Sequence, residues 1–323
     1  MIRARAIGCG AFLPDNIVTN DDLAKKVDTS DAWIRERTGI RQRYIALEGQ
    51  TTSDLAMGAA RDALIDSGID AGELDMVIVA TTTPDRSFPS VATMVQSRLG
   101  MVRGAAFDVQ AVCSGFIYGL SLADSLIRTG QARTILLIGA ETMSRLLDWN
   151  DRATCVLFGD GAGAVVLQAH DGRGDNSDRG ILNTRIFSDG RLHDLLYTDG
   201  GVSSTGSAGL LKMQGREVFR HAVTNISAAI EASAAAAGIA ISDVDWFVPH
   251  QANQRILDGT ARKLGIDPAK VISTVASHGN TSAASVPLAL ATAVKDGRIK
   301  QGDLVLLEAM GAGFTWGACL LRW

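Results

Sequence analysis

The sequence predicts a layered α/β fold built from two related halves. Short apolar segments of strand length alternate along the chain with longer amphipathic or alanine-rich segments, which is typical of α/β proteins. Stretches in the two halves also resemble each other at a nearly constant offset, which indicates an internal duplication. A large core is expected, because 46% of the residues are hydrophobic and only 20% are charged.

The expected elements alternate from the first residues onward. The segment Met1–Leu13 is interrupted by Gly8 and Gly10, so it predicts a first strand, Ala4–Cys9, rather than a signal peptide. The further expected strands are Met76–Ala80, Ala105–Val109, Thr134–Ile138, Ala162–Leu167, Asp245–Val248, Leu304–Leu307 and Ala318–Leu321. The expected helices are Ser53–Ser67, Ser90–Leu99, Ser114–Arg128, Arg216–Ala237, Gln251–Leu264 and Ser282–Lys295.

Two pairs of strands carry the duplication. The segment Met76–Thr81 matches Asp245–His250 at an offset of 250 − 81 = 169 residues. The segment Thr134–Ala140 matches Asp303–Ala309 at the same offset, 303 − 134 = 169. Each match alone is weak, but their shared order makes coincidence a poor explanation.

A third match places extra residues in the first half. Gly163 matches Gly317 at an offset of 317 − 163 = 154, so 169 − 154 = 15 extra residues are expected within Glu141–Cys155. The halves are expected to divide into residues 1–172 and 173–323.

The composition excludes several classes of protein. The net charge of −4 argues against a nucleic-acid-binding protein, although a local basic patch could still bind an acidic partner. No run of 18 apolar residues suggests a membrane span. Cys9, Cys113, Cys155 and Cys319 are far apart, which fits reduced thiols in a cytoplasmic protein without disulfides or a zinc site.

Cys113 is the first candidate for chemistry. It lies at the corner between the strand Ala105–Val109 and the helix Ser114–Arg128. The N–H groups of a first helical turn and the positive end of the helix dipole favour the thiolate there. A buried structural cysteine is the alternative, and the position of its polar partners argues against it.

His250 and Asn280 are the partners that the duplication places near this thiol. The common offset relates Cys113 to Ser282, so all three residues fall where strands end, at the edge where α/β sheets bind ligands. A cysteine can carry an acyl group as a thioester, while His Nε2–H and an Asn amide can donate to an enolate oxygen. His250 could instead be a satisfied polar residue and Asn280 a helix cap.

At these residues the chain closely resembles the β-ketoacyl-acyl carrier protein synthase III family. The resemblance covers essentially the whole chain, through the motifs Thr81–Asp85, Val112–Gly115, Phe158–Ala164, His250–Asn253, His278–Asn280 and Gly313–Gly317. It implies a homodimer with the thiolase fold, two duplicated halves in five αβαβα layers. It also implies decarboxylative Claisen condensation of an acyl-coenzyme A with malonyl-acyl carrier protein. The coenzyme A thioester is then a substrate, and neither a metal nor a redox cofactor is needed.

The resemblance also assigns roles to residues. It implies a catalytic triad of Cys113, His250 and Asn280, with an oxyanion hole from the backbone N–H groups of Cys113 and Ala312. Glycine is common at the position of Ala312, but alanine keeps the N–H group. Phe88 is expected to cross the dimer interface and close the acyl pocket of the other subunit, which favours acetyl and other short starters.

A coenzyme A site is expected near the N-terminus. Trp33 and Arg37 are four residues apart and share a helical face, so they could hold an adenine and a phosphate. The resemblance adds Arg152 as the second side of an adenine clamp, and Thr29 and Thr38 as polar contacts. A surface tryptophan packed on an arginine stem is the alternative.

A basic face is expected to bind the acyl carrier protein. Arg255 and Arg262 lie two turns apart on one expected helix, with Lys263 beside them and Arg220 on the preceding helix. Such charges are often only a solvated face. The resemblance implies that this face binds acyl carrier protein, an acidic partner that a basic patch would steer.

Other activities stay open at this point. A relative from polyketide or quinolone biosynthesis could use the same residues with another starter or acceptor. A thiolase is disfavoured because it needs a second cysteine in the loop Gly311–Phe314, and Cys319 lies beyond that loop. A cysteine hydrolase also uses Cys, His and Asn, and a non-catalytic binding module is the last alternative.

Overall fold

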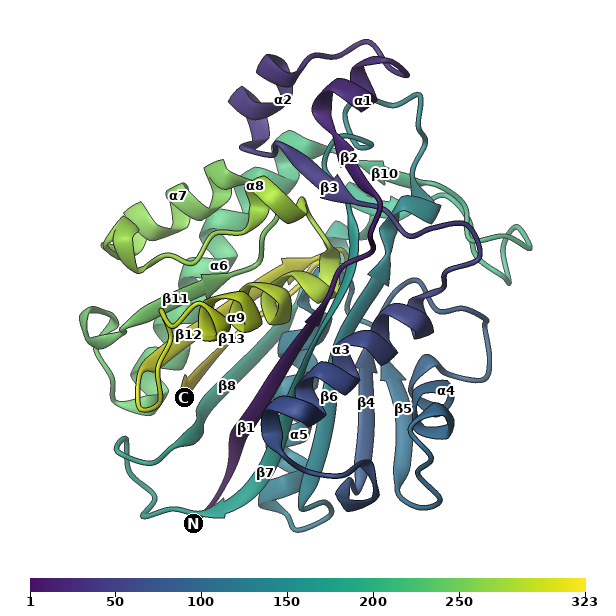
Figure 1. Ribbon diagram of the computed structural model, residues 1–323. Helices are drawn as coiled ribbons and strands as arrows, with labels where there is room; N and C mark the ends of the chain where they lie inside the picture. Colours follow the sequence, from purple (N-terminus) through teal and green to yellow (C-terminus); the bar gives the residue numbers. More distant parts are fainter.

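Two mixed β-sheets of similar topology organise the protein (Figure 1). The computed structural model describes residues 1–323. The first sheet has the order β1 (Ile2–Phe12), β7 (Asp160–Asp171), β6 (Thr134–Thr142), β4 (Met76–Ala80) and β5 (Ala105–Val109). The second has the order β8 (Gly180–Ser188), β13 (Thr315–Arg322), β12 (Leu304–Gly311) and β11 (Trp246–Pro249).

The longer helices form three layers around these sheets (Figure 1). They are α3 (Thr52–Ser67), α4 (Val91–Arg98), α5 (Gly115–Arg128), α6 (Gly215–Ala237), α7 (Gln254–Leu264) and α9 (Ser285–Lys295). Side chains of α3 and α4 pack on the outer face of the first sheet, α5 and α9 lie between the sheets, and α6 and α7 cover the outer face of the second. The five predicted layers are therefore present.

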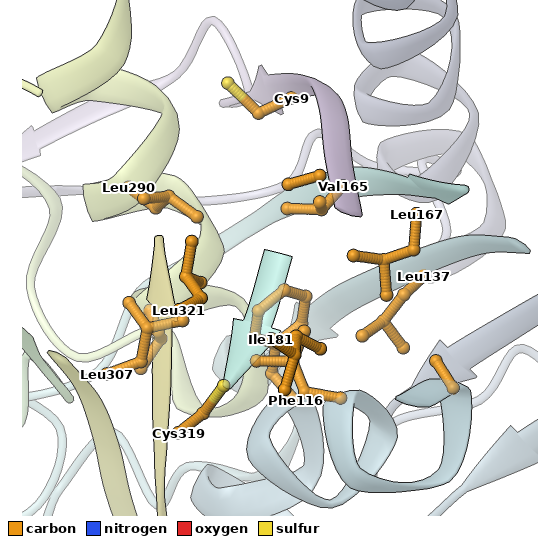
Figure 2. Packing of buried hydrophobic residues seen from close by; sticks show 14 of the residues in the cluster. Cys9, Phe116, Leu137, Val165, Leu167, Ile181, Leu290, Leu307, Cys319 and Leu321 are labelled. Carbon is orange, nitrogen blue, oxygen red and sulfur yellow. The ribbon is translucent and has the colours of Figure 1, made fainter. Parts of the chain in front are cut away.

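Strand alternation explains how one sheet serves two layers. Ile135 and Leu137 of β6 belong to the core between the sheets, whereas Leu136 and Ile138 belong to the core under α3. Figure 2 shows the central core, where Phe116 of α5 lies among side chains from strands of both sheets. Both faces of each sheet are covered, which accounts for the continuous apolar runs in the sequence.

Two aspartates show the true register of the duplication. The Asp75 carboxylate accepts the Thr134 N–H at 3.0 Å, and the Asp245 carboxylate accepts the Leu304 N–H at 2.8 Å. Both members of this interaction are therefore related by 245 − 75 = 304 − 134 = 170 residues. The predicted offset of 169 was wrong by one, because short apolar runs match almost equally well after a slip of one residue.

The same offset of 170 relates the two corners that precede α5 and α9. Val112 and Ser282 are the two non-glycine residues with positive φ, at 47° and 50°, and 282 − 112 = 170. Cys113 is therefore the counterpart of Ala283, not of Ser282 as expected. Gly163 still pairs as the counterpart of Gly317, so the first half carries 170 − 154 = 16 extra residues.

Some elements differ from the sequence prediction. β8, which completes the second sheet, was not expected. α7 begins at Gln254 rather than Gln251, because the Asn253 side chain caps it by accepting the Arg255 N–H. The expected helix from Ser282 begins as a 3₁₀ turn, Ser282–Ala284, before α9.

Smaller elements connect the layers. β2 and β3 form a two-stranded ribbon, and α1 and α2 lie beside it at the top of Figure 1. Their bounds, with the remaining short elements, are β2 (Ile17–Thr19), α1 (Asn20–Ala24), α2 (Asp31–Thr38), β3 (Gln42–Tyr44), β9 (Leu196–Thr198), β10 (Leu211–Met213) and α8 (Val275–His278). None of the helices combines the length and apolar character that crossing a bilayer requires. β7 ends at Asp171 and β8 begins at Gly180, so the division between residues 172 and 173 lies in a connection and stays a prediction.

We predict that Phe116→Ala lowers the free energy of unfolding by about 3–5 kcal/mol, because it empties a fully buried site in the central core. Urea denaturation followed by circular dichroism measures this change. Leu122→Ala on the same helix is the control, since Leu122 is 39% exposed and should cost about 1 kcal/mol or less. Equal losses for the two variants would contradict the assigned core.

Candidate active site

Cys113 lies in a 3₁₀ turn, Val112–Ser114, between β5 and α5. The chain turns sharply there through the positive φ of Val112. The loop after β12 approaches this turn so closely that a Cβ atom on Gly311 would lie 2.7 Å from the Cys113 nitrogen. The corner position predicted from the sequence is confirmed, and a glycine at 311 is what allows the two halves to meet there.

The expected low pKa of this thiol is not what the structure gives. Cys113 is 4% exposed, and burial raises the pKa of its thiol to about 12, although the Ser282 side chain beside it lowers the pKa. Burial also raises the pKa of Cys9 to about 12 and that of Cys155 to about 11. Thiol pKa therefore does not distinguish Cys113 from the structural cysteines; its polar neighbours do.

His250 follows β11 and is held by Ser285 at the start of α9. The Nδ1 atom of His250 lies 2.5 Å from the Ser285 Oγ, which also accepts the Gln251 N–H at 3.2 Å. Since Nδ1 is the acceptor available for the Ser285 hydroxyl hydrogen, the ring proton is assigned to Nε2. Burial lowers the pKa of His250 to about 3, so the ring is neutral and Nε2–H is a donor.

Asn280 is oriented by its own turn. Its Oδ1 atom accepts the Ser282 N–H at 2.9 Å, which leaves the Nδ2 group as the donor for a ligand. Its backbone is fixed to the extra segment of the first half, because Asn280 N–H donates to Leu157 O at 2.8 Å and Gly159 N–H donates to Asn280 O at 3.0 Å. The side chain is buried and its amide cannot rotate without losing the Ser282 bond.

Gln251 links the two polar segments, and the sequence did not single it out for this role. Its Oε1 atom accepts the N–H groups of Thr274 and Val275 at 2.7 and 3.0 Å. Its Nε2 group donates to Pro249 O and Ile272 O at 2.7 and 3.1 Å. A buried side chain with all these bonds fixes the spacing between the end of β11 and the loop that leads to Asn280.

Ala312 lies in the turn between β12 and β13. The Thr315 hydroxyl lies 3.0 Å from both Ala312 O and Ala111 O, and it accepts the Ser114 hydroxyl at 2.7 Å. These contacts join the glycine-rich turn of the second half to the cysteine corner of the first. The Ala312 backbone is thus held beside Cys113, as the sequence predicted for an oxyanion site.

The expected adenine clamp is present as a cluster on α2 and the extra segment. The guanidinium carbon of Arg37 lies 4.6 Å from the centroid of the Trp33 ring, and that of Arg152 lies 5.1 Å from it. Arg152 also donates to Asp28 O at 2.9 Å. Because Arg152 contacts the Trp33 ring directly, an adenine stacked on that face would have to displace its guanidinium.

The two expected threonines differ from each other. Thr38 is buried, and its hydroxyl donates to Ile34 O at 2.7 Å and accepts the Ile40 N–H at 3.0 Å. Its bonds therefore end α2, and its contact with coenzyme A stays a prediction. The Thr29 hydroxyl has no partner within the chain.

The predicted basic face is exposed. Arg255, Arg262 and Lys263 are exposed on α7, and Arg220 is exposed on α6, which packs against α7. Arg220 pairs with Glu217 at 2.6 Å, and Arg255 donates to Glu36 O at 3.0 Å. The second bond ties the start of α7 to α2, so the basic face adjoins the Trp33 clamp.

The comparisons with known proteins agree with this geometry. A family model described as 3-oxoacyl-[acyl-carrier-protein (ACP)] synthase III matches residues 107–190, and the corresponding C-terminal model matches residues 234–323. The chain is 65% identical, over 323 residues and the whole length of both proteins, to the beta-ketoacyl-[acyl-carrier-protein] synthase III of Rhodospirillum rubrum. The chain belongs to this synthase III family.

Solved structures confirm the thiolase fold expected from the sequence. The 3-oxoacyl-[acyl-carrier-protein] synthase III of Aquifex aeolicus is 46% identical, with a TM-score of 0.93 and coverage of 99% of this chain and 100% of that one. The priming β-ketosynthase of the R1128 polyketide pathway is 34% identical, with a TM-score of 0.93 and coverage of 99% and 96%. The family is one of condensing acyltransferases.

We predict that His250 stays neutral as the Nε2–H tautomer from pH 5 to 8. The pKa of His250 is lowered on folding, so its neutral form favours folding above about pH 6.5, and this contribution is lost as the pH falls toward 3. Long-range ¹H–¹⁵N NMR correlations of histidine-labelled protein report both properties. Ser285→Ala should populate both tautomers. An Nδ1–H tautomer, or an imidazolium at pH 6, would refute the assignment.

Proposed function

We propose that this synthase III condenses an acyl-coenzyme A, acetyl-coenzyme A first, with malonyl-acyl carrier protein, and so begins fatty acid synthesis. The observation that carries the proposal is the pairing of a buried thiol with two fixed neutral donors, His250 Nε2–H and Asn280 Nδ2. Neutral donors suit an enolate oxygen that gains charge during the reaction. The names of the relatives support the same activity.

In the first half-reaction, the Cys113 sulfur attacks the carbonyl carbon of the acyl-coenzyme A. The Cys113 and Ala312 N–H groups are the proposed donors to the oxyanion of the tetrahedral intermediate. A new sulfur–carbon bond forms at Cys113, and the coenzyme leaves as a thiolate that takes up a proton. The product is an acyl-enzyme thioester, which keeps the acyl group activated.

In the second half-reaction, malonyl-acyl carrier protein replaces the coenzyme. As its carboxylate leaves as carbon dioxide, the electron pair moves to the thioester enolate, whose oxygen is bound by His250 Nε2–H and Asn280 Nδ2. The enolate carbon then attacks the acyl group on Cys113, and Cys113 leaves as a thiolate. A neutral histidine is suited to this step, because it stabilises the enolate without protonating its carbon.

Both substrates are proposed to enter beside α2 and α7. Arg255 is bonded to the Glu36 carbonyl, and the Asn253 side chain donates to Arg37 O at 3.1 Å, so the clamp and the basic face form one continuous rim. Coenzyme A would use Trp33, Arg37, Arg152, Thr29 and Thr38. The acyl carrier protein would bind Arg220, Arg255, Arg262 and Lys263 through its acidic surface.

The preference for a short starter rests on the proposed homodimer. Phe88 is 84% exposed in the single chain, which is unusual for a large aromatic side chain. β5 is the edge strand of the first sheet, and its outer side has no neighbouring strand. A second copy covering this edge would bury Phe88 and allow it to close the acyl pocket of the other subunit.

A polyketide starter is the second candidate function. The similarity to the R1128 priming β-ketosynthase favours it, since the fold is shared at 34% identity. Greater identity to the synthase III enzymes favours fatty acid synthesis. We place the reaction in the cytoplasm, because all four cysteines are free.

We predict that His250→Ala and Asn280→Ala still form the acyl-enzyme but release carbon dioxide from malonyl-acyl carrier protein about 10²–10³ times more slowly, the usual cost of one lost oxyanion-type donor. Single-turnover acylation and radiolabelled carbon dioxide release measure the two steps separately. His278→Ala is the control, because His278 is a second largely buried histidine outside the proposed triad. Wild-type carbon dioxide release by either variant would disprove its role.

We also predict that Arg255→Glu with Arg262→Glu weakens use of malonyl-acyl carrier protein but leaves acylation by acetyl-coenzyme A nearly intact. The loss should lie in kcat/KM for the carrier and diminish as salt screens the charges. Arg173→Glu with Lys300→Glu is the charge-matched control, at the ends of the sheets opposite Cys113. Equal losses in both half-reactions would contradict a separate carrier surface.

A further inference from the structure

We propose that Glu141 accepts the Cys113 proton through the Ser282 hydroxyl and returns it when Cys113 leaves the condensed product. The proposal rests on the proposed function, acyl transfer through Cys113, and assigns the base that this transfer needs. A thiol with a pKa far above neutrality is a poor nucleophile unless a base removes its proton during attack. His250 is not that base, since its Nδ1 is bonded to Ser285 and its Nε2 carries a proton.

Glu141 is a fully buried carboxylate near the end of β6, surrounded by donors. Its Oε2 atom accepts the hydroxyls of Thr81 and Thr83 at 3.2 and 2.6 Å and the Thr82 N–H at 3.1 Å. These bonds give the Thr81–Asp85 motif a physical purpose, because they hold one carboxylate in place. No arginine or lysine pairs with it, which is rare for a buried carboxylate.

Ser282 connects this carboxylate to the cysteine corner. Its hydroxyl donates to the Glu141 Oε1 at 3.0 Å, and its side chain lies beside the Cys113 thiol. Ser282 has a strained positive φ of 50°, and its N–H is bound by Asn280. The strain therefore places one hydroxyl between the nucleophile of the first half and the only carboxylate bonded to it.

Two opposing effects keep Glu141 able to gain or lose a proton near neutral pH. Burial raises the pKa of Glu141 to about 7, while the bonds from Thr83, Thr82, Ser282 and Thr81 oppose the rise. Other titratable groups near the corner are His250, whose pKa burial lowers to about 3, and Glu308, whose pKa burial raises to about 8. Glu308 shares its face of β12 with Leu306 and Met310 in the core under α6, away from α5.

The proton balance closes over one catalytic cycle. As the Cys113 sulfur bonds to the acyl carbon, its hydrogen passes to the Ser282 Oγ, and the Ser282 hydrogen passes to the Glu141 carboxylate. The coenzyme thiolate takes its proton from solvent. When the enolate carbon displaces Cys113, the protonated Glu141 returns its hydrogen through Ser282 to the departing thiolate. The cycle consumes one solvent proton, as loss of carbon dioxide from a carboxylate requires.

Alkylation of Cys113 by iodoacetamide tests the relay without any substrate. Its rate is measured from pH 5.5 to 9 by peptide mass spectrometry for the wild type, Glu141→Gln, Ser282→Ala and the double variant. Glutamine should be tolerated, because the surrounding hydroxyls can turn to accept its N–H groups. Asp124→Asn is the control for removing a buried carboxylate, since Asp124 lies on α5 and bonds Arg128 instead. Glu308→Gln tests the second carboxylate.

The wild type should show a rise in rate near pH 7 as Glu141 ionises. Glu141→Gln should lose this rise and react about 10–100-fold more slowly at pH 8, at the lower end of general-base effects because cysteine is itself nucleophilic. Ser282→Ala should behave alike, and the double variant should be no slower than either single one. Asp124→Asn and Glu308→Gln should keep the wild-type profile.

The opposite sign would overturn the relay. If Glu141 acted only through its charge, which raises the pKa of Cys113, its removal would speed alkylation. A faster or unchanged Glu141→Gln, or a profile that changes only in Glu308→Gln, refutes the proposal. These results leave the proposed function intact if acetyl-coenzyme A still acylates wild-type Cys113. Absence of acylation in the wild type refutes the proposed function instead.

Discussion

The burial of one thiol at the meeting point of two similar halves is the constraint on which the site depends. Burial protects a thioester from water, but it also raises the pKa of Cys113 to about 12 and costs the free energy of placing polar groups in the core. The protein meets this cost with side chains whose bonds are fixed from behind, such as Gln251 and Ser285. The donors that remain, on His250 and Asn280, face the only place left for a ligand.

The duplication explains how such a site arises from one repeated frame. Both halves carry the same sharp corner before a central helix, with positive φ at Val112 and at Ser282. The chemistry is divided between them: the position of Cys113 holds Ala283 in the second half, and the position of His250 holds Ala80 in the first, since 250 − 80 = 170. Neither half could hold an acyl group and stabilise an enolate alone.

Sequence reasoning succeeded where the signal was local. Apolar runs and the Cys113 corner identified the layers and the nucleophile, and the motifs identified the family. The register of the duplication was wrong by one residue, because sliding an apolar run costs little in sequence but is fixed in space by Asp75 and Asp245. The raised pKa of Cys113, the role of Ser285 and the threonine cage of Glu141 depend on burial and on contacts between distant segments, which composition and periodicity do not report.

The central claim is that a single buried cysteine carries the acyl group. Cys9 and Cys319 lie in the apolar core of Figure 2, and Cys155 is buried near the clamp, without the donors that surround Cys113. Mass spectrometry of the intact and digested protein after brief exposure to acetyl-coenzyme A tests this claim most directly. We expect one acetyl group per chain, on Cys113 alone, and none in Cys113→Ser. An acetyl group on another cysteine, or condensation by a protein that never becomes acylated, would contradict it.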